Sequence, residues 1–530
     1  MPLQPILIAG AWRQSENPVG SFSAVNPATK SPLPEQYPIS GLEDIDLILQ
    51  AGQEAVAELR SSGSTAALAH FLDCFAKNIE AKADALVETA ALETALPAET
   101  RLRSIELPRT TNQLRQAANA ARDGSWRRAT IDTGSDIRAI YGPIGGPVVV
   151  FGPNNFPFAF NSVAGGDFAA AIAAGNPIIA KGNPGHPGTT RILAEAAFEA
   201  LQESGLPPGM VQLIYHTPPE TGLKLVSEPR IGATAFTGSR TAGLKLKEAA
   251  DQAGKPIYLE MSSVNPVFIL PGVLRERPDQ IAGELYTSCS LGAGQFCTKP
   301  GIVVIQQNAE GEKFVEQVKQ LFEQNRPGTL LNGAGAKGIA SALTVLEGHG
   351  AELLTGGHEV EGERFAFDNS LLRVSGGRFL EAPEALQTEA FGTASLIVAA
   401  KDVDEMVEIA AELEGNLTGC VYSHTGNEDE AAYQQLEPVL RQKVGRLLND
   451  KMPTGVAVVP SMNHGGPFPA TGHPGFTAVG IPASLLRFAA LYSYDNVRHH
   501  RLPPELQDKN PNGRLWRLID GTWTQGDVLG

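Results

Sequence analysis

The chain has 530 residues, more than one compact core accommodates, so two or more domains are expected. Its 42 basic and 58 acidic residues give a formal net charge of −16, which argues against a nucleic acid or an anionic membrane as a partner. The four cysteines form no C-x-x-C pair, so a disulfide framework and a zinc ribbon do not fit. A reducing cytoplasm is therefore the expected location.

The first 14 residues lack the basic start and the apolar core of a signal peptide. Residues 42–121 have apolar side chains at three- and four-residue spacing, which predicts helices. The stretch between Arg138 and Asp167 carries no charge, but prolines and glycines interrupt it. A lipid-exposed helix could not satisfy its backbone there, so a buried strand, a turn and a helix start are predicted instead.

Short apolar strands alternate with helices from residue 148 onward. The predicted order is strand 148–151, helix 161–174, strand 177–180, helix 189–204, strand 211–215, strand 233–236 and a helix from about Thr241. Such alternation predicts a parallel sheet of Rossmann type with helices on both faces.

A second α/β segment is predicted from about residue 257 to 449, with strands at 302–305 and 395–399. The residues after Pro503 are polar and are expected to be irregular. Residues 333–338 match the pattern G-x-G-x-x-G, but the preceding RPGTLLN is a poor strand. This match is therefore not expected to bind a dinucleotide.

One cysteine stands in a setting that favours reactivity. Cys297 lies in GAGQFCTKPG, where glycines and a proline turn the backbone on both sides and Lys299 is close. A cysteine is more commonly a small buried apolar residue. The turns and the basic neighbour favour a nucleophilic thiol in a cleft.

Six features in chain order resemble those of the aldehyde dehydrogenase superfamily, and the resemblance runs from about residue 5 to 500. They are PNNFPF at 153–158, Lys181 after the second strand, FTGS at 236–239, LEMSS at 259–263, QFC at 295–297 and EAFGT at 389–393. LEMSS replaces the usual E-L-G-G, and Thr393 stands where a proline is usual.

The resemblance implies an α/β fold with three parts. A Rossmann-type cofactor domain is expected at 1–124, 146–256 and 458–484, and an α/β catalytic domain at 257–457. A small oligomerisation arm is expected at 125–145 and 485–500, followed by a C-terminal tail at 501–530. Members of the superfamily form dimers or tetramers, so a homodimer or homotetramer is expected.

The resemblance and the chemistry of aldehyde oxidation point to the same catalytic residues. The Cys297 thiolate would add to the carbonyl and form a thioester once hydride has left. The Asn155 side chain and the Cys297 backbone N–H would stabilise the alkoxide, each donor contributing roughly 3–4 kcal/mol. Glu260 would activate the water that hydrolyses the thioester. No metal is expected.

An NAD(P) cofactor follows from the same resemblance. Lys181 and Glu389 are expected at its ribose hydroxyls, and Phe391 beside the nicotinamide. The residues expected near its pyrophosphate, at the start of a helix, are Gly238, Ser239 and Gly243.

The segment after the second strand bears on the choice between NAD and NADP. It reads KGNPGH, and Pro184 stands where many family members have a glutamate that repels the 2′-phosphate of NADP. Lys181, Asn183, His186 or Arg240 would instead meet that phosphate. NADP is therefore predicted to be accepted and preferred, with NAD as the alternative.

Within the superfamily the chain most resembles 2-oxoglutarate-semialdehyde (2,5-dioxopentanoate) dehydrogenases. Bacterial long-chain fatty-aldehyde dehydrogenases share the same features, so both substrates stay open, with the oxo-acid semialdehyde favoured. Arg101 and Arg109 would bind a carboxylate, whereas Phe156, Phe160 and Phe468 would wall an apolar tunnel.

Two further alternatives are a CoA-acylating relative and a catalytically silent structural member of the superfamily. The acylating branch typically lacks the base at the position of Glu260. A silent member would not retain Cys297, Glu260 and Asn155 together. Both alternatives are therefore disfavoured.

Overall fold

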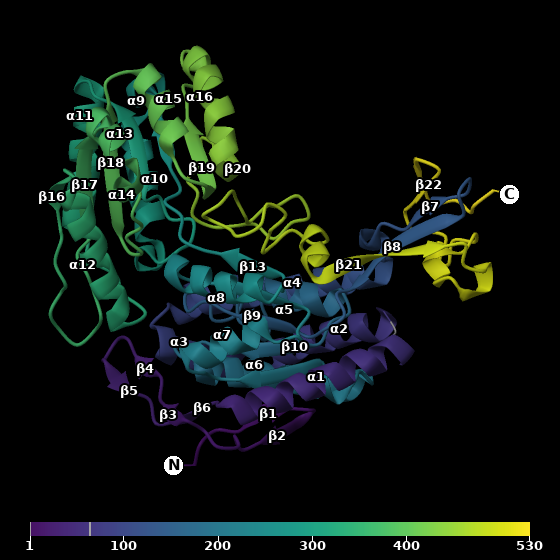
Figure 1. Cartoon of the computed structure of the whole chain (residues 1–530). Helices are drawn as coiled ribbons and strands as arrows, with labels where there is room; N and C mark the ends of the chain where they lie inside the picture. Colours follow the sequence, from purple (N-terminus) through teal and green to yellow (C-terminus); the bar gives the residue numbers. More distant parts are fainter. Residues whose placement is uncertain (1, 63–64, 530) are drawn as a thin grey trace.

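The structure is a computed structural model and describes residues 2–62 and 65–529. Two sheets of seven strands and one sheet of five organise the described part of the chain (Figure 1). In Figure 1 the first large sheet lies in the lower half, the second lies at the upper left, and the five-stranded sheet projects to the right. The predicted α/β fold class is confirmed.

The first sheet has the strand order β13-β12-β9-β10-β11-β1-β2. Its five strands from β9 to β13 run parallel and are almost entirely buried, as expected where helices cover both faces. The order reverses between β9 and β12, and the strand ends at such a switch point form a ligand-binding crevice. The bounds are β1 Ile6–Ile8, β2 Ala11–Arg13, β9 Val148–Phe151, β10 Ile178–Lys181, β11 Val211–Ile214, β12 Ala233–Thr237 and β13 Ile257–Glu260.

Helices pack against this sheet and share its apolar core. They are α1 Leu42–Ser62, α2 Thr65–Ala81, α3 Ala83–Thr94, the π-helix η1 Ala98–Glu106, α4 Leu107–Asp123, α5 Gly166–Ala173, α6 Pro187–Ser204, α7 Pro219–Ser227 and α8 Arg240–Gln252. The ribbons β3–β6 (Gly20–Phe22 with Tyr37–Ile39) and β4–β5 (Val25–Asn26 with Ser31–Pro32) lie near the N-terminus. Across the described residues, every helix is too short or too polar to span a membrane.

The second sheet has the order β16-β17-β18-β15-β14-β19-β20, and all strands but β16 run parallel. Its strands are β14 Val267–Ile269, β15 Ile302–Gln306, β16 Glu352–Thr355, β17 Ser370–Ser375, β18 Ala394–Ala400, β19 Asn416–Tyr422 and β20 Val444–Asn449. Its helices are α9 Pro271–Glu276, α10 Pro278–Ser290, α11 Ala309–Gln324, α12 Gly333–Gly348, α13 Gly376–Glu381, α14 Pro383–Leu386, α15 Val403–Glu412 and α16 Glu430–Lys443.

The strands predicted from the sequence lie within one residue of those observed, but one helix begins later than predicted. Residues 161–165 form turns, and α5 begins only at Gly166. The Asn161 side chain accepts a hydrogen bond from the Val163 N–H at 3.0 Å, an arrangement that competes with helix formation. The G-x-G-x-x-G match at 333–338 opens α12 and follows a turn rather than a strand.

A boundary also differs. The catalytic segment was expected to begin at residue 257, but β13 pairs in parallel with β12 and belongs to the first sheet. The apolar IYLE sequence suits this buried position. The second unit therefore begins only after Glu260, which ends the last strand of the first sheet.

The five-stranded sheet has the order β21-β8-β7-β22-β23. Its strands β7 (Thr130–Asp132), β8 (Ile137–Pro143) and β21 (Ala489–Asp495) fall in the segments where an arm is predicted. The residues expected to form an irregular tail supply β22 (Arg517–Ile519) and β23 (Thr522–Thr524). Leu502 and Leu506 pack with Ile131 and Ile140, so apolar burial anchors this segment in spite of its polar composition.

A long connection from 450 to 482 returns from the second sheet to the first. Its Ala470 carbonyl accepts the Met261 N–H at 2.8 Å, and its Gly472 N–H donates to Leu259 at 3.1 Å. On the other side, Asn463 donates to the Gly445 carbonyl at 3.1 Å. The connection is therefore bonded to both large sheets and crosses the crevice between them.

Candidate active site

Cys297 lies on a sharply turned loop that follows α10. Gly292, Ala293 and Gly294 have φ values of 59°, 55° and 71°, which places all three in the left-handed region. A Cβ on Gly294 would lie 2.1 Å from the carbonyl carbon of Gly392, so only glycine fits that close approach. The turns leave Cys297 partly exposed, as a nucleophile requires.

A buried asparagine fixes the other side of this loop. The Asn265 side-chain amide donates to the carbonyls of Cys297 and Lys299 at 2.9 and 3.0 Å. Asn265 is fully buried and follows the LEMSS segment, so it connects the end of the first sheet to the cysteine loop. The Lys299 ammonium donates to the Ala394 carbonyl at 2.5 Å instead of facing the thiol.

The Cys297 thiol has two titratable neighbours, Glu260 and His464. The Cys297 Sγ lies 3.5 Å from Nε2 of His464, and the same nitrogen lies 3.0 Å from Oε1 of Glu260. One ligand atom from each residue falls within 4.8 Å of the other two. Both Glu260 and His464 are 1% exposed. The structure thus brings together the predicted nucleophile, the predicted base and an imidazole.

Burial and the Glu260 carboxylate raise the pKa of the Cys297 thiol well above its ordinary value. The thiol therefore needs a proton acceptor before it can attack a carbonyl. Glu260 has an acceptor oxygen available to take a proton, because its Oε2 is buried and has no hydrogen-bond partner in the structure.

His464 was not predicted from the sequence. It lies in MNHGGP, a segment without the alternation or spacing that marks a motif, on the connection between the two sheets. Its two partners are 167 and 204 residues away in the chain. A histidine followed by two glycines in a loop was the available signal, and the fold alone shows what it faces.

Asn155 reaches the cysteine loop from the turn after β9. Its side-chain Nδ2 donates to the carbonyl of Gln295 at 2.9 Å, and Asn155 is buried. Gln295 in turn accepts the Leu331 N–H at its own Oε1, at 3.0 Å. The amide that was expected to stabilise an alkoxide is therefore bonded to a residue two positions before the nucleophile.

A cavity of about 1120 Å³ opens beside this loop. It lies between η1, α4, the loop 291–296 and the connection after β20. Its wall includes Arg101, Arg109, Phe156, Phe296 and Val458. The cavity thus combines aromatic walls with two guanidinium groups.

The two arginines differ in how they are bonded. Arg101 lies over the rings of Phe156 and Phe296 at 4.3 and 4.7 Å and pairs with buried Glu106 at 3.2 Å. Arg109 lies over Phe156 and Phe160 at 5.6 and 5.1 Å. Its Nε and Nη2 are buried without a hydrogen-bond partner, and burial lowers the pKa of this arginine.

The predicted aromatic residues have different positions. Phe156 lines the cavity, whereas Phe160 lies behind it, packed against Phe156 and His464 with ring centroids 5.2 and 5.8 Å apart. Phe468 is 61% exposed and does not line the cavity, which contradicts its predicted role. Its backbone carbonyl accepts the Gly415 N–H at 3.2 Å, and this contact keeps the segment at the surface.

The residues predicted to meet a 2′-phosphate are mostly engaged within the protein. The Asn183 side chain donates to the Gly152 carbonyl at 3.1 Å, and His186 Nε2 lies 2.9 Å from the Pro153 carbonyl. Arg240 forms a two-pronged ion pair with Glu414 at 2.8 and 2.9 Å. Three of the four residues expected to meet the phosphate thus have partners within the protein.

Lys181 is the fourth. It ends β10, at the same sheet edge as the switch point, and burial lowers its pKa to about 8. His216, just after the neighbouring β11, has a buried Nδ1 without a partner. Burial and the charge of Lys181 lower the pKa of His216 to about 4. His216 was not predicted from the sequence.

The helix start near the predicted pyrophosphate position is α8. Ser239 caps it, because its Oγ accepts the Ala242 N–H at 3.3 Å. The two glycines also allow close internal packing. A Cβ on Gly243 would lie 2.9 Å from the Met261 sulfur, and one on Gly238 would lie 2.7 Å from the Phe236 ring. The capped N-terminus of a 13-residue helix suits a phosphate group.

Glu389 lies in a second cavity, of about 230 Å³, that it shares with Arg240, Ser262 and Glu414. Burial raises the pKa of Glu389 to about 7, against the opposing effect of Lys299. Phe391 follows in the same loop, directly before Gly392, which packs on the cysteine loop. Glu389 and Phe391, the residues predicted to contact the ribose and the nicotinamide, therefore lie in a loop that packs on the loop of Cys297.

Residues 12–457 match the aldehyde dehydrogenase family. The chain is 38% identical over 519 residues to alpha-ketoglutaric semialdehyde dehydrogenase 2 of Azospirillum brasilense, covering 95% of this chain and 96% of that one. It is 34% identical over 527 residues to the alpha-ketoglutaric semialdehyde dehydrogenase of Acinetobacter baylyi, with the same coverage.

A solved structure has the same fold. The gamma-glutamyl-gamma-aminobutyraldehyde dehydrogenase of Burkholderia cenocepacia superimposes with a TM-score of 0.79 at 21% identity, covering 94% of this chain and 98% of that one. The likeness thus covers most of each chain.

Proposed function

The chain belongs to the aldehyde dehydrogenase family, and from this premise we propose that its substrate is an aldehyde that also carries a carboxylate. The family oxidises aldehydes with a nicotinamide cofactor. The best candidate reaction is the oxidation of 2,5-dioxopentanoate to 2-oxoglutarate. The single observation that carries this choice is the buried guanidinium of Arg109, which has unpaired N–H groups at the wall of the cavity beside Cys297.

A carboxylate is the natural partner of Arg109. A buried N–H without a partner costs about 1–3 kcal/mol, and a bound carboxylate would remove that cost through charge-assisted hydrogen bonds. The aromatic rings of Phe156 and Phe160 hold the guanidinium flat, so it is already oriented. The names of the two similar semialdehyde dehydrogenases describe substrates with this combination of groups.

The proposed reaction begins with the Cys297 thiol. In the tautomer with hydrogen on Nδ1, Nε2 of His464 accepts the thiol proton as Sγ bonds to the carbonyl carbon. The same nitrogen faces Glu260 at 3.0 Å, so the proton then passes to that carboxylate. His464 is thus proposed as the intermediate carrier between nucleophile and base.

The second half of the reaction uses Glu260 as the base that activates water. A bound nicotinamide cofactor would supply the hydride acceptor, and Cys297 would hold the acyl group as a thioester once hydride has left the tetrahedral carbon. Once it has released its proton, Glu260 takes a proton from water through its free Oε2, and hydroxide adds to the thioester. The thiolate leaves and is reprotonated, and Asn155 donates to the alkoxide in both halves.

Lys181 supports NADP as the preferred cofactor. Residues 182–186 hold no carboxylate that would repel a 2′-phosphate, and Lys181 carries positive charge at the sheet edge where the adenosine ribose would bind. Asn183, His186 and Arg240 do not support the proposal, because they are bonded within the protein. The preference therefore depends on Lys181, and NAD is the alternative.

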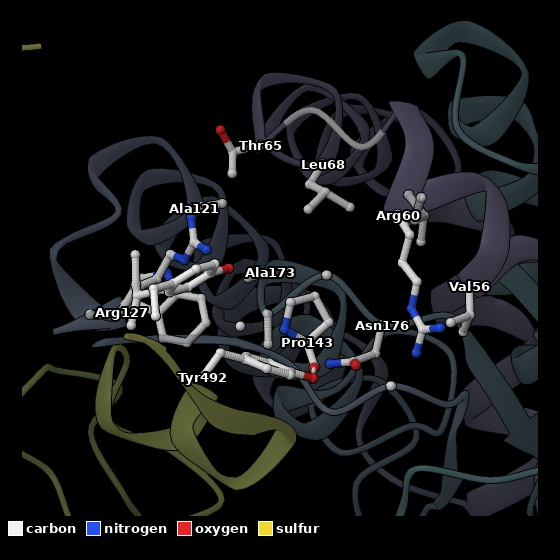
Figure 2. Close-up of a pocket in the computed structure, with 18 residues that line it drawn as sticks. Val56, Arg60, Thr65, Leu68, Ala121, Arg127, Pro143, Ala173, Asn176 and Tyr492 are labelled. Atoms are coloured by element: carbon white, nitrogen blue, oxygen red, sulfur yellow. Dashed lines mark hydrogen bonds between the residues drawn. The ribbon is translucent and has the colours of Figure 1, made fainter. Parts of the chain in front are cut away.

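We also propose a homo-oligomer that forms through the arm. β21 is an edge strand whose Leu491 and Tyr492 are 56% and 42% exposed. At its base lies a cavity of about 420 Å³, with Arg127 and Tyr492 on one side and Arg60 on the other (Figure 2). Apolar residues in such a projecting edge strand favour burial by a second copy. A sizing measurement distinguishes dimer from tetramer. The cytoplasmic location also stays a prediction.

A panel of aldehydes tests the substrate. The panel holds 2,5-dioxopentanoate, succinate semialdehyde, glutaraldehyde and a long-chain aldehyde, each with both cofactors and with and without CoA. We expect the highest kcat/KM with 2,5-dioxopentanoate and no acyl-CoA. A higher value for the long-chain aldehyde would reject the proposed substrate, and an acyl-CoA product would reject hydrolysis.

Arg109→Leu sharpens the test. KM for 2,5-dioxopentanoate is expected to rise about 10–100-fold, the loss of one or two charge-assisted hydrogen bonds, with a smaller effect on an uncharged aldehyde. The control is Arg103→Leu, because Arg103 lies on η1 but pairs with Asp84 and Glu99 at the surface. An equal rise in KM for charged and uncharged aldehydes would show that Arg109 does not bind the carboxylate.

A further inference from the structure

We propose that Cys297, His464 and Glu260 also form a binding site for a zinc-like divalent cation, which would inhibit the enzyme reversibly. The three side chains come from three distant parts of the chain, so the sequence shows no metal motif. The site is one that the fold assembles.

The donor set matches zinc chemistry. Zn²⁺ binds thiolate, imidazole and carboxylate, and a site with three protein ligands keeps a fourth position for water. One thiolate and one carboxylate carry two negative charges, which neutralise the cation in a buried setting. Mg²⁺ and Ca²⁺ would require more oxygen ligands than this site offers, so a zinc-like cation fits it better.

The spacing of the donor atoms also fits. With zinc–ligand bonds of about 2.0–2.3 Å, a tetrahedral site places sulfur and nitrogen about 3.5 Å apart, and nitrogen and oxygen about 3.4 Å apart. The observed distances are 3.5 Å from Sγ to Nε2 and 3.0 Å from Nε2 to Oε1, and all three donor atoms fall within 4.8 Å. Small side-chain shifts suffice to complete the tetrahedron.

A second observation points to a ligand at the same place. Glu260 is only 1% exposed, and its Oε2 is buried without any hydrogen-bond partner. A cation would turn this carboxylate into a ligand and would displace the proton of the Cys297 thiol to solvent. His464 would bind through Nε2 with its remaining proton on Nδ1, so no side chain keeps an unsatisfied charge.

The consequence is a block of the nucleophile. A thiolate bound to zinc cannot add to a carbonyl, and the imidazole that accepts its proton is occupied as well. Cys74 offers a contrasting environment: it lies on α2, and its sulfur is 3.7 and 3.6 Å from the two ring nitrogens of His70. Removing this partly exposed pair with Cys74→Ser leaves, among the described residues, the thiol–imidazole–carboxylate site of Cys297 to measure.

Cobalt titration of the full-length Cys74→Ser protein tests the site without substrate or cofactor, so the outcome does not depend on the proposed reaction. We expect one Co²⁺ per chain with a thiolate-to-cobalt charge-transfer band, displaced by one equivalent of Zn²⁺. Cys297→Ser should remove the band, and Cys289→Ser should keep it, because Cys289 is buried beside Ser395 and Pro300.

His464→Asn and His464→Gln decide whether the imidazole is a ligand. Each should weaken Co²⁺ binding at least about 10–100-fold, the size of loss typical even for groups behind a metal ligand. Zn²⁺ inhibition of the parent should reverse on adding a chelator. Equal cation affinity in both variants, or a charge-transfer band that survives Cys297→Ser, would overturn the proposal.

Discussion

At the scale of single residues, the position of one nitrogen controls the chemistry. Nε2 of His464 lies within reach of both Cys297 and Glu260, and it holds only one proton at a time. It can therefore accept from the thiol or donate to the carboxylate, but not both together. This makes the proton's location a property of all three residues rather than of any one.

Glu260→Gln tests the division of labour. The amide cannot take a proton from water, so the thioester should accumulate after one turnover. We expect a single-turnover burst of NADPH by stopped-flow absorbance, followed by steady-state turnover lowered about 10²–10⁴-fold. Cys297→Ala should give no burst at all. A normal steady-state rate in either variant would contradict the roles given to these residues.

The pKa of Lys181 predicts how cofactor choice depends on pH. Burial lowers this pKa to about 8, and the protonated form is the one that attracts a phosphate. The affinity for NADP relative to NAD should therefore be highest below pH 8 and fall as pH rises through that value, with the midpoint moved upward by the bound phosphate.

Equilibrium fluorescence titrations with both cofactors, on both sides of pH 8, measure this ratio. Lys181→Met should remove the pH dependence and lower the ratio. Parallel pH profiles for NAD and NADP in the parent protein would show that Lys181 does not meet the 2′-phosphate.

The sequence identified some of these residues and not others for physical reasons. Cys297, Glu260 and Asn155 lie in contiguous motifs, so local sequence was enough to propose them. The role of His464 depends on its partners on other elements, which no local sequence pattern reveals. The partners of Asn183 and Arg240, Gly152 and Glu414, could not be predicted either, because these bonds form only in the folded chain.

At the scale of elements, the cysteine loop shows how backbone geometry presents a side chain. The strands were predictable because their residues are apolar and buried on both faces, whereas the late start of α5 and the strands β22 and β23 depend on side-chain competition and tertiary packing. The need for glycine at position 294 also depends on tertiary packing, because its contact with Gly392 joins residues 98 positions apart.

Gly294→Ala is expected to reduce activity severely. The added Cβ would meet backbone at 2.1 Å, and φ of 71° is strained for alanine, so the loop must move. The matched control is Gly283→Ala in α10, where a Cβ meets nothing within 4 Å and helix propensity should raise stability by up to about 1 kcal/mol. Thiol alkylation rates and thermal melts measure both; full activity in Gly294→Ala would contradict the constraint.

At the scale of the whole molecule, residues 501–529 complete the arm. Arg517 is fully buried and donates to the carbonyls of Gln507, Asp508 and Gly526 at 2.6, 3.0 and 2.8 Å. This one side chain thus joins two bends, at residues 507–508 and at residue 526, in a segment with few apolar residues. The arm's cohesion comes from a polar centre in addition to the apolar contacts of Leu502 and Leu506.

Arg517→Met should destabilise the arm selectively. Three partly buried hydrogen bonds would be lost, so the segment after residue 500 should become sensitive to limited proteolysis and Tm should fall. Arg514→Met, at an exposed position three residues away, should change neither. An unchanged digestion pattern for Arg517→Met would show that β22 and β23 do not need this centre.

The connection from 450 to 482 has a further consequence. It is hydrogen-bonded to both large sheets, so a single backbone cut within it would leave two fragments that still adhere to each other. His464, however, would no longer be held between sulfur and carboxylate by a continuous chain. Nicking by a protease would therefore silence the enzyme while its shape and melting behaviour persisted, which makes activity a more sensitive reporter of chain integrity than folding.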